Sequence, residues 1–572
     1  MNPDRPLQPA ALALPRRRGW HWAATAAERA TGLQQLDRLY QQRPLSLTPT
    51  AFVRYSLQQL DISYSVASGQ LDSIPASGPL IVLCNHPYGA ADGLVLADLL
   101  LQRRPDVLLF ANTLLRRVPE IAPLIAPVDV FKPGASLGGV RAALRHLSAG
   151  GTLVLFPAGE VSRVDWRGRR IADPPWAESV ALLARRSGAQ LLPMRIDGHA
   201  RWPSLLAGVL HPRLRTACLP KDLLQQRHSR VRLHLGEPIA AAELARLAPQ
   251  AQTAYLRLLS DSLGRSRAAA LPITTPKPLA AEQPAQQLAA ELAALPPVCT
   301  LCQQGPFTVY LASAEQIPRV LLEIGRLREL SFRQVQEGTG EALDLDAFDA
   351  HYQHLFVWHQ TERCVIGAYR LGFTAQLDGG VAALYTHTLF DYDARLLAHL
   401  GPSIELGRSF VRPEWQRNFR ALRLLWSGIA TVMDTHPDIR CLFGPVSISA
   451  SYSPMARALM ETALSAHHSD ATLQALVRPR TPSAGTRSNA ETRQVIAALS
   501  DPSLLSRVIA RVQRGSGLPV LVRHYLDLKG RFAGFNVDAA FGNTLDGLVF
   551  IRVEDIPAAV RAKFGGLARP TR

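Results

Sequence analysis

A stretch rich in proline and alanine divides this chain near its middle and limits what the chain can fold into. It runs from about 266 to 305 and contains Pro272, Pro276, Pro278, Pro284, Pro296 and Pro297. Proline lacks the N–H that a helix interior or a central strand needs, so this stretch predicts a linker with at most one short helix. A chain of 572 residues also exceeds one ordinary domain. The sequence therefore predicts two domains on either side of the linker.

Both sides of the linker alternate apolar runs with helical patterns. Before it, short apolar runs end in turns, in PLIVLCNH, DVLLFAN, GTLVLFPAGE, AQLLPMRIDG and RVRLHLGEPI. After it, HLFVWH, CVIGAYRLGF, SIELGRSFV and IRCLFGPVS predict strands, and RALRLLWSGIATVMDTH predicts an amphipathic helix. With 47% hydrophobic and 19% charged residues, the chain has enough apolar surface for real cores. The predicted fold class is α/β in both domains.

The positive charge is unevenly distributed. The net charge is +17, of which residues 1–270 carry +14 and residues 271–572 carry +3. Such an excess predicts an anionic partner, either nucleic acid, an anionic membrane surface or an acidic protein. The basic half has no recognisable nucleic-acid-binding module, so we expect no nucleic acid partner. A basic cluster at 16–18 beside Trp20 and Trp22, and the Arg201-Trp202-Pro203 run, suit a peripheral protein on anionic lipid. Tryptophans packed in the core beside exposed arginines are the equally weighted alternative.

No targeting, spanning or metal-binding pattern stands out. The N-terminal arginines follow a short apolar stretch instead of preceding a long one, and no run of about 18 apolar residues occurs. We therefore expect a cytoplasmic protein, peripheral at a membrane surface. Among the six cysteines only Cys299 and Cys302 lie close in sequence, and no histidine cluster accompanies them. No metal is expected.

A histidine and an aspartate mark the first candidate site. The apolar run PLIVLC leads directly into NHPYGAADG, where Pro87 and Gly89 prevent a continuous helix. His86 should therefore lie at a strand-to-loop turn, and a helix that begins near Asp92 would bring the carboxylate to it. A histidine oriented by a carboxylate can make a hydroxyl nucleophilic at neutral pH. A turn histidine and a capping aspartate are the alternative.

Four ordered blocks resemble the glycerolipid acyltransferase superfamily, over residues 50–265 and after a basic and aromatic segment at 1–49. The blocks are NHPYGAADG, LLFANTLLRRVPE, FPAGEVSR and LLPMRIDG. The resemblance implies His86 as general base with Asp92 as its orienting partner, and places Asn85, Gly159, Glu160 and Arg163 at the substrate. The motif has one more residue than usual between its histidine and aspartate. The third block has its acid displaced to Glu160, which argues against an acceptor carrying a phosphate.

Charged residues inside apolar runs mark the second candidate site. Arg370 ends the run VIGAYR, and Glu405 and Arg408 lie in IELGRSFV. Strand alternation would put the last two on opposite faces, so a bulge or bend at Gly407 is needed to pair them. Buried charge is costly unless it is paired, so these residues are either functional or a structural ion pair.

An ordered set of polar and aromatic residues over about 310–555 resembles the acyl-homoserine-lactone-synthase-like branch of the GNAT acyltransferases, and most closely the ornithine N-acyltransferases. The resemblance implies a GNAT-like mixed-sheet domain over 306–572. It implies Glu405 as the residue that deprotonates or positions the attacking amine, and a substrate-binding set of Arg328, Phe332, Asp346, Asp349, Arg370 and Arg408. RPEWQRNFRALRLLW has Phe419 or Arg420 where a glycine would open a coenzyme A pyrophosphate turn. This favours acyl carrier protein over acyl-CoA as donor, with no other cofactor.

Taken together, the two halves resemble the bifunctional ornithine lipid synthases of bacteria. That resemblance implies transfer of a 3-hydroxyacyl group to the α-amine of ornithine by the C-terminal domain. The N-terminal domain would then acylate the 3-hydroxyl of the lyso-ornithine lipid. The alternative is a single-activity acyltransferase, for a phospholipid or for a glycine, glutamine or lysine lipid, with one degenerate domain.

Overall fold

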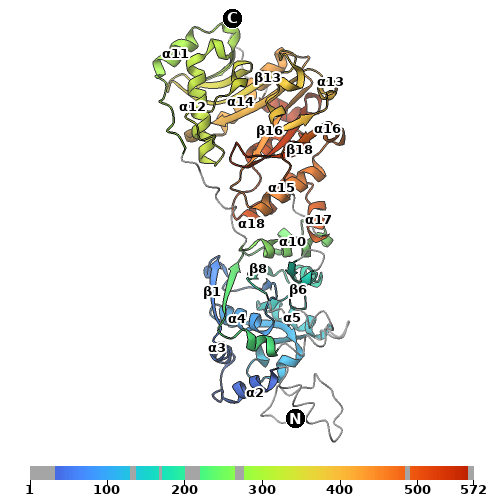
Figure 1. Ribbon diagram of the computed structural model, residues 1–572. Coiled ribbons are helices and arrows are strands. Elements are labelled where there is room, and N and C mark those ends of the chain that lie inside the picture. The colour runs from blue at the N-terminus through green and yellow to red at the C-terminus, as the bar shows by residue number, and fades with distance from the viewer. Residues whose placement is uncertain are drawn as a thin grey trace. The chain divides into compact units, whose positions relative to one another are not determined.

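The computed structural model describes residues 32–128, 137–165, 170–199, 220–264, 276–483 and 490–564 (Figure 1). The chain forms two compact units, Met1–Arg265 with Ser488–Ala498, and Ser266–Arg487 with Leu499–Arg572. The basic and aromatic clusters at 16–22 and 201–203 lie outside the described residues. None of the described helices is long and apolar enough to cross a membrane.

The first unit is built on a seven-stranded sheet. In spatial order its strands are β1 (Ser63–Ser68), β9 (Arg230–Leu235), β8 (Gln190–Ile196), β2 (Leu80–Cys84), β5 (Thr152–Leu155), β3 (Val107–Asn112) and β4 (Ile125–Val128). Neighbouring strands are parallel except β8 and β9. All five residues of β2 are buried, as expected for the centre of a parallel sheet covered on both faces.

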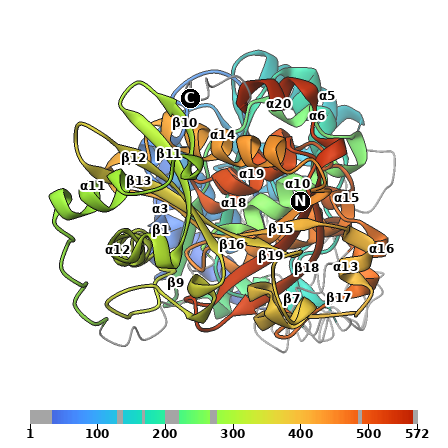
Figure 2. The ribbon, with the colours of Figure 1, turned by 90° about the horizontal axis from the view of Figure 1, so that it is seen from above.

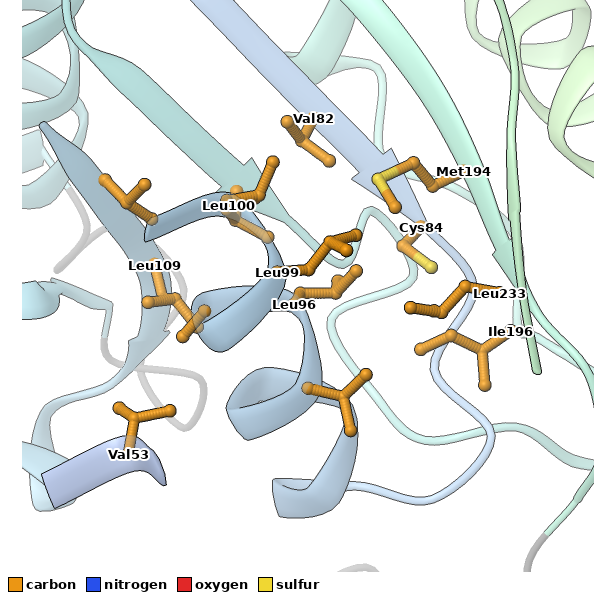
Figure 3. Close-up of a cluster of buried hydrophobic side chains, with 14 of the residues drawn as sticks. Val53, Val82, Cys84, Leu96, Leu99, Leu100, Leu109, Met194, Ile196 and Leu233 are labelled. Atoms are coloured by element: carbon orange, nitrogen blue, oxygen red, sulfur yellow. The ribbon is translucent and has the colours of Figure 1, made fainter. Parts of the chain in front are cut away.

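Helices surround this sheet and complete its core. Those described are α2 (Leu33–Gln41), α3 (Pro49–Gln59), α4 (Ala90–Leu101), α5 (Leu137–Ser148), α6 (Ser179–Ser187), α9 (Ala241–Leu244), α10 (Pro249–Ser262) and α17 (Ala490–Ala497), with the hairpin β6 (Arg163–Asp165) and β7 (Arg170–Ala172). Leu96 and Leu99 of α4 pack toward Cys84 at the end of β2, and Met194 and Leu233 of the next strands close the cluster (Figure 3). Each fully buried side chain of this kind contributes about 1.5–3 kcal/mol. The core therefore fixes the end of β2, where the first candidate site begins.

Helix α17 belongs to the first unit although it comes late in the chain. It packs against α10, and Arg257 of α10 pairs with Glu491 at 2.7 Å. In Figure 1 it is the orange-red helix beside the green α10. The predicted C-terminal domain of 306–572 did not anticipate this return of the chain.

The second unit is built on an eight-stranded mixed sheet. In spatial order its strands are β10 (Thr300–Gln304), β11 (Phe307–Ser313), β12 (Gln353–His359), β13 (Cys364–Phe373), β15 (Ser403–Val411), β16 (Cys441–Ile448), β19 (Thr544–Arg552) and β18 (Arg531–Asp538). Only β15 and β16 are parallel, and they pair only over Ser403–Glu405. Both units are therefore α/β with mixed sheets, as predicted.

Two long helices cover opposite faces of this sheet (Figure 2). Helix α12 (Pro318–Gln334) shares a core with Phe356, while Gly428 of α14 (Phe419–Thr435) lies against the neighbouring Leu355. Successive residues of a strand point to opposite faces, so the two helices form the outer layers. The remaining described α-helices and strands are α11 (Ala285–Ala293), α13 (Leu396–Leu400), α15 (Pro454–His467), α16 (Ala471–Leu476), α18 (Pro502–Gln513), α19 (Val520–Asp527), α20 (Ala558–Phe564), β14 (Phe390–Tyr392) and β17 (Val477–Pro479).

The C-terminal part of the predicted linker packs onto the second unit. Leu288 and Leu292 of α11 are buried in the core beneath α12. The backbone N–H groups of Lys277 and Ala280 donate to the carbonyls of Gly340 and Ala342. The prediction of one short helix in the stretch matches α11, but the described residues from 276 onward are part of the folded unit.

Candidate functional site

In the first unit, the sequence blocks meet at one edge of the sheet. Strand β2 leads into His86, β5 leads into Phe156, and β8 ends at Ile196. These three strands are neighbours and parallel, so their carboxyl ends lie together. Open α/β sheets bind ligands at this edge, because the loops there can converge.

His86 and Asp92 form a hydrogen-bonded pair at this edge. Gly89, with a φ of 73°, turns the chain so that α4 begins at Ala90 and places Asp92 in its first turn. Asp92 Oδ2 lies 2.9 Å from His86 Nδ1 and accepts the N–H groups of Tyr88 and Gly89 at 2.9 and 3.1 Å. Burial raises the pKa of Asp92, and the hydrogen bond and charge of His86 oppose that shift. The loop before α4 therefore brings the two side chains into contact, and their catalytic roles stay a prediction.

The free face of His86 is suited to proton transfer. The side chain is 18% exposed while Asp92 is fully covered. Its Nε2 has no hydrogen-bond partner among the described residues. With Nδ1 tied to a carboxylate, Nε2 is the nitrogen that can take a proton from a substrate hydroxyl. Phe156 stacks on the ring at 3.9 Å between centroids and fixes its plane.

A second carboxylate, which the sequence reasoning missed, holds the main chain at His86. Asp173 Oδ1 accepts the His86 N–H at 3.3 Å and the Ser162 hydroxyl at 2.5 Å, and Oδ2 accepts the Trp176 indole N–H at 3.3 Å. The Ser162 N–H in turn donates to the His86 carbonyl at 2.8 Å. Asp173 lies in ADPPW, which carries no recognisable motif, so only the fold reveals its place.

The other predicted residues of this half divide into buried and exposed groups. Asn85 uses both ends of its amide to bond the main chain of Ile196, at 2.7 and 2.8 Å, and so ties β2 to β8 beside the pair. Gly159 adopts a φ of 67° in the turn after β5. Glu160 and Arg163 are exposed. Their contact with substrate stays a prediction.

In the second unit, buried arginines and aspartates gather between α12 and β13. Arg328 of α12 and Arg370 of β13 are both 0% exposed. Arg328 bonds Asp349 at 2.7 Å, and Arg370 bonds Asp346 at 2.5 Å and lies 3.3 Å from Asp349. Burial alone would raise the pKa of Asp349, but the two guanidinium charges lower it to about 2. Each arginine still has two nitrogens without a hydrogen-bond partner, so the network has donors to spare.

A bulge in β15 delivers a third arginine to the same network. Arg408 and Ser409 together oppose Tyr369 of β13, and Arg408 has a φ of 48°. The sequence placed the bulge one residue earlier, at Gly407, because glycine tolerates such a conformation most readily. A bulge is therefore present, but at Arg408 itself.

Arg408 forms its ion pairs with the aspartates of the network and not with Glu405. Its nitrogens lie 3.2 Å from Asp344, 3.5 Å from Asp346 and 2.8 Å from the Tyr385 hydroxyl. Burial opposes its charge, but Tyr385 and the two aspartates raise its pKa. The expected direct pair with Glu405 is thus replaced by shared contact with Tyr385.

Glu405 occupies a cradle of donors. It is 1% exposed and accepts the hydroxyl of Tyr352 and the backbone N–H groups of Tyr385 and Thr386, the last two at 3.1 and 2.7 Å. These bonds hold the loop at 385–386 against the arginine network. Its action on an attacking amine stays a prediction, and the geometry requires that it act from this fixed position.

Several residues that complete this site have weak sequence signals. Asp344 lies two positions before Asp346, and this spacing in a strand-like pattern could have suggested that both aspartates belong to the site. His354 is fully buried, and its Nε2 lies 3.0 Å from the Asp349 carbonyl. Burial and the Arg328 charge lower the pKa of His354 to about 4. Phe332, the remaining predicted residue, meets Phe541 edge to face at 5.1 Å.

No group of three or more histidine, cysteine, aspartate or glutamate side chains placed to hold a metal ion occurs within the described ranges.

Two protein families match parts of this chain, one on each side of the linker. Residues 29–260 match an acyltransferase family, and residues 327–427 match the acetyltransferase (GNAT) domain family.

Curated relatives match this chain over less than half of its length. The glycine N(alpha)-acyltransferase of Bacteroides thetaiotaomicron is 31% identical over 266 residues, which cover 43% of this chain and 78% of the relative. The chain belongs to the acyltransferases. This acyltransferase also resembles the glycine N(alpha)-acyltransferase of Phocaeicola vulgatus, at 29% identity over 43% of the chain and 80% of the relative. The lyso-glycine lipid O-acyltransferase of the same organism is 24% identical over 33% of the chain and 68% of the relative.

Proposed function

We propose that this acyltransferase makes ornithine lipid in two successive transfers, one in each unit. The observation that carries the proposal is the presence on one chain of two unlike sites, the His86–Asp92 pair and the buried arginine and aspartate network around Glu405. The matched relatives are named for an N-acyl transfer and for an O-acyl transfer to a lyso-lipid. One chain with a domain of each kind is suited to carry out both steps in order.

The second unit carries out the first transfer. The α-amine of the acceptor attacks the thioester carbonyl of a 3-hydroxyacyl group, an amide forms, and the thiol of the carrier leaves with the amine proton. Glu405 holds the loop at Tyr385, and the arginines bind the carboxylate of the acceptor. Spare N–H groups on Arg328 and Arg370 suit that part, because a carboxylate accepts two parallel donors from a guanidinium.

The first unit carries out the second transfer. Nε2 of His86 takes the proton of the 3-hydroxyl as its oxygen attacks a second thioester, and returns it to the leaving thiolate. Asp92 stabilises the imidazolium that forms between these steps. The proposed acceptor carries a hydroxyl and no phosphate. An acidic residue at position 160 is therefore compatible with it, because no phosphate has to be bound there.

The acyl donor is a thioester of acyl carrier protein. Strands β15 and β16 pair only over Ser403–Glu405 and stay close at Leu406, where a Cβ on Gly444 would lie 2.0 Å from the carbonyl oxygen. An extended phosphopantetheine arm would therefore lie beyond Leu406, where the two strands no longer pair. Arg417 and Arg420 line a surface hollow at the start of α14, where they suit the acidic surface of a carrier protein.

Glycine is the second candidate acceptor, because the two N-acyltransferase relatives are named for it. Lipid extracts of a host that expresses this chain distinguish the two by the mass of the head-group fragment. Detection of ornithine lipid supports the proposal, and detection of glycine lipid supports the alternative. If neither aminolipid is detected, both are contradicted.

We further propose that the basic first unit works at the inner face of the bacterial membrane. Its net charge of +14 over residues 1–270 favours anionic lipid. Flotation with vesicles containing anionic lipid at low salt should carry the chain to the top of the gradient, and neutral vesicles should not. Equal flotation with both would contradict an electrostatic attachment.

A further inference from the structure

The segment that holds the main chain of His86 is itself held by an arginine of α10. Arg257 is 7% exposed, and its Nη1 donates to the Pro174 carbonyl at 3.0 Å. Its Nη2 donates to the Asp173 carbonyl at 2.8 Å. The Asp173 carboxylate in turn accepts the His86 N–H at 3.3 Å. Arg257 therefore fixes the stretch of backbone from which Asp173 reaches the His86–Asp92 pair.

The acid that pairs with Arg257 lies 234 positions further along the chain. Glu491, in the first turn of α17, accepts a hydrogen bond from Arg257 Nη1 at 2.7 Å. Asp261 of α10 is the more distant partner, with its carboxylate 3.8 Å from Arg257 Nε. A buried guanidinium needs a close anion, because an unpaired charge there is costly. Glu491 therefore determines how the Arg257 side chain is held.

Helix α17 is an inserted part of the first unit. The residues before and after it in sequence belong to the second unit, but the helix itself packs against α10 (Figure 1). Val495 and Ile496 of α17 are 0% and 5% exposed, so the helix buries apolar surface as well as forming the ion pair. The first unit thus takes one helix from the C-terminal half of the chain.

We propose that α17 completes the O-acylation site, with Glu491 and Arg257 as positioning residues for His86. This rests on the proposed O-acyl transfer and adds a requirement to it: residues 1–265 alone lack part of the support of that site. The contacts run from Glu491 through Arg257 to the backbone at 173–174, and from the Asp173 carboxylate to the His86 main chain. Neither positioning residue touches the acceptor. Both act by keeping the imidazole where its Nε2 can take the hydroxyl proton.

The substitution Glu491→Ala in the full chain tests the first of these contacts. O-acylation of supplied lyso-ornithine lipid should fall about 10- to 100-fold in kcat, because a displacement of about 1 Å can cost about 100-fold. KM for the lyso-lipid should stay within about twofold, since the residue does not touch it. Glu491→Gln keeps an oxygen for Arg257 Nη1 and should restore most of the rate. Asp261→Asn removes the other acid beside Arg257 and is the matched control, which should keep the wild-type rate.

Hydrogen exchange followed by mass spectrometry gives a second readout that needs no turnover. The His86 N–H is bonded to Asp173, and the Ser162 N–H is bonded to the His86 carbonyl. Peptides that contain these two amides should exchange at least about tenfold faster in Glu491→Ala than in the wild type. Peptides from β4, the strand at the opposite edge of the sheet from β1, should exchange at the wild-type rate.

The outcomes separate the role of α17 from the proposed transfer. An unchanged kcat in Glu491→Ala, an equal loss in Asp261→Asn, or unchanged exchange at His86 and Ser162 overturns the role of α17. Faster exchange over the whole unit, β4 included, also overturns it, because the ion pair would then only stabilise the fold. A wild-type chain that acylates no lyso-lipid, with exchange in Glu491→Ala changed as expected, overturns the proposed transfer and leaves the support of His86 by α17.

Discussion

The substitution Asp92→Asn separates the charge of the His86–Asp92 pair from its geometry. Asp92 accepts all its hydrogen bonds, from His86, Tyr88 and Gly89, through Oδ2, and Oδ1 has no partner within the described ranges. An asparagine with its carbonyl oxygen in the Oδ2 position keeps the three bonds. The substitution therefore removes a negative charge and leaves the orientation of His86 in place.

The magnitude follows from the distance between the two groups. In the proposed O-acyl transfer His86 takes the proton of the acceptor, and the resulting imidazolium lies 2.9 Å from the Asp92 oxygen. Two unit charges whose centres lie about 4 Å apart interact by about 4 kcal/mol at an effective dielectric constant of about 20. That energy corresponds to a loss of about 10³-fold in the rate of O-acyl transfer. KM for the lyso-lipid should change little, because the ground state carries no imidazolium.

The assay is O-acylation of supplied lyso-ornithine lipid by the purified full chain, followed by mass spectrometry. N-acyl transfer by the same preparation controls for folding, since that site lies in the other unit. Burial disfavours the charged form of Asp92, so the neutral variant should not lower the free energy of unfolding by more than about 1–2 kcal/mol. An O-acylation rate within tenfold of the wild type would refute the charge argument. Equal loss of both activities would show that the substitution disturbs folding and does not act through the charge alone.

Three further predictions concern the second unit. Asp349→Asn leaves the Arg328 and Arg370 charges poorly compensated, so the unfolding free energy of that unit should fall by about 3–5 kcal/mol in urea titration; an unchanged midpoint would contradict the network. His354 is neutral when folded, with a pKa near 4 against about 6.5 unfolded, so stability should be full above pH 6.5 and fall by up to about 3 kcal/mol toward pH 4. His354→Gln should flatten that slope, and a slope as steep as the wild type's would count against this cause. Glu405→Gln turns an amide N–H toward donors, so N-acyl transfer should drop about 100-fold while O-acylation of supplied lyso-lipid persists; unaffected N-acyl transfer would show that the cradle is not needed.

The sequence predicted the fold class and the two-domain order well because each rests on local patterns. The buried run PLIVLC became β2, and the turn residues after it put His86 and Asp92 at the edge of the sheet. Burial of a whole apolar run and a turn forced by proline and glycine need no information from distant parts of the chain. The same reasoning anticipated a bulge in β15, because alternation alone could not bring Arg408 to the face of Glu405.

Contacts between distant segments could not be read in this way. Asp173 reaches His86 across 87 positions of sequence, from a segment with no motif. The return of α17 to α10 depends on packing that its short polar sequence does not reveal. Glu337 looks like an ordinary solvated acid after a helix, but it is buried in the fold, where Gly542 lies against the preceding residue. The bulge fell on Arg408 and not on Gly407 because the guanidinium bonds at Asp344 and Tyr385 compensate for the left-handed backbone.

The central claim is that one chain carries two acyltransferase sites that work in series. The most direct measurement supplies the purified chain with ornithine, a 3-hydroxyacyl carrier protein and a second acyl carrier protein, and follows both lipids by mass spectrometry. The wild-type chain should convert lyso-lipid into the diacylated product, and His86→Ala should accumulate lyso-lipid and form none of that product. Diacylated lipid from His86→Ala at the wild-type rate would contradict the account.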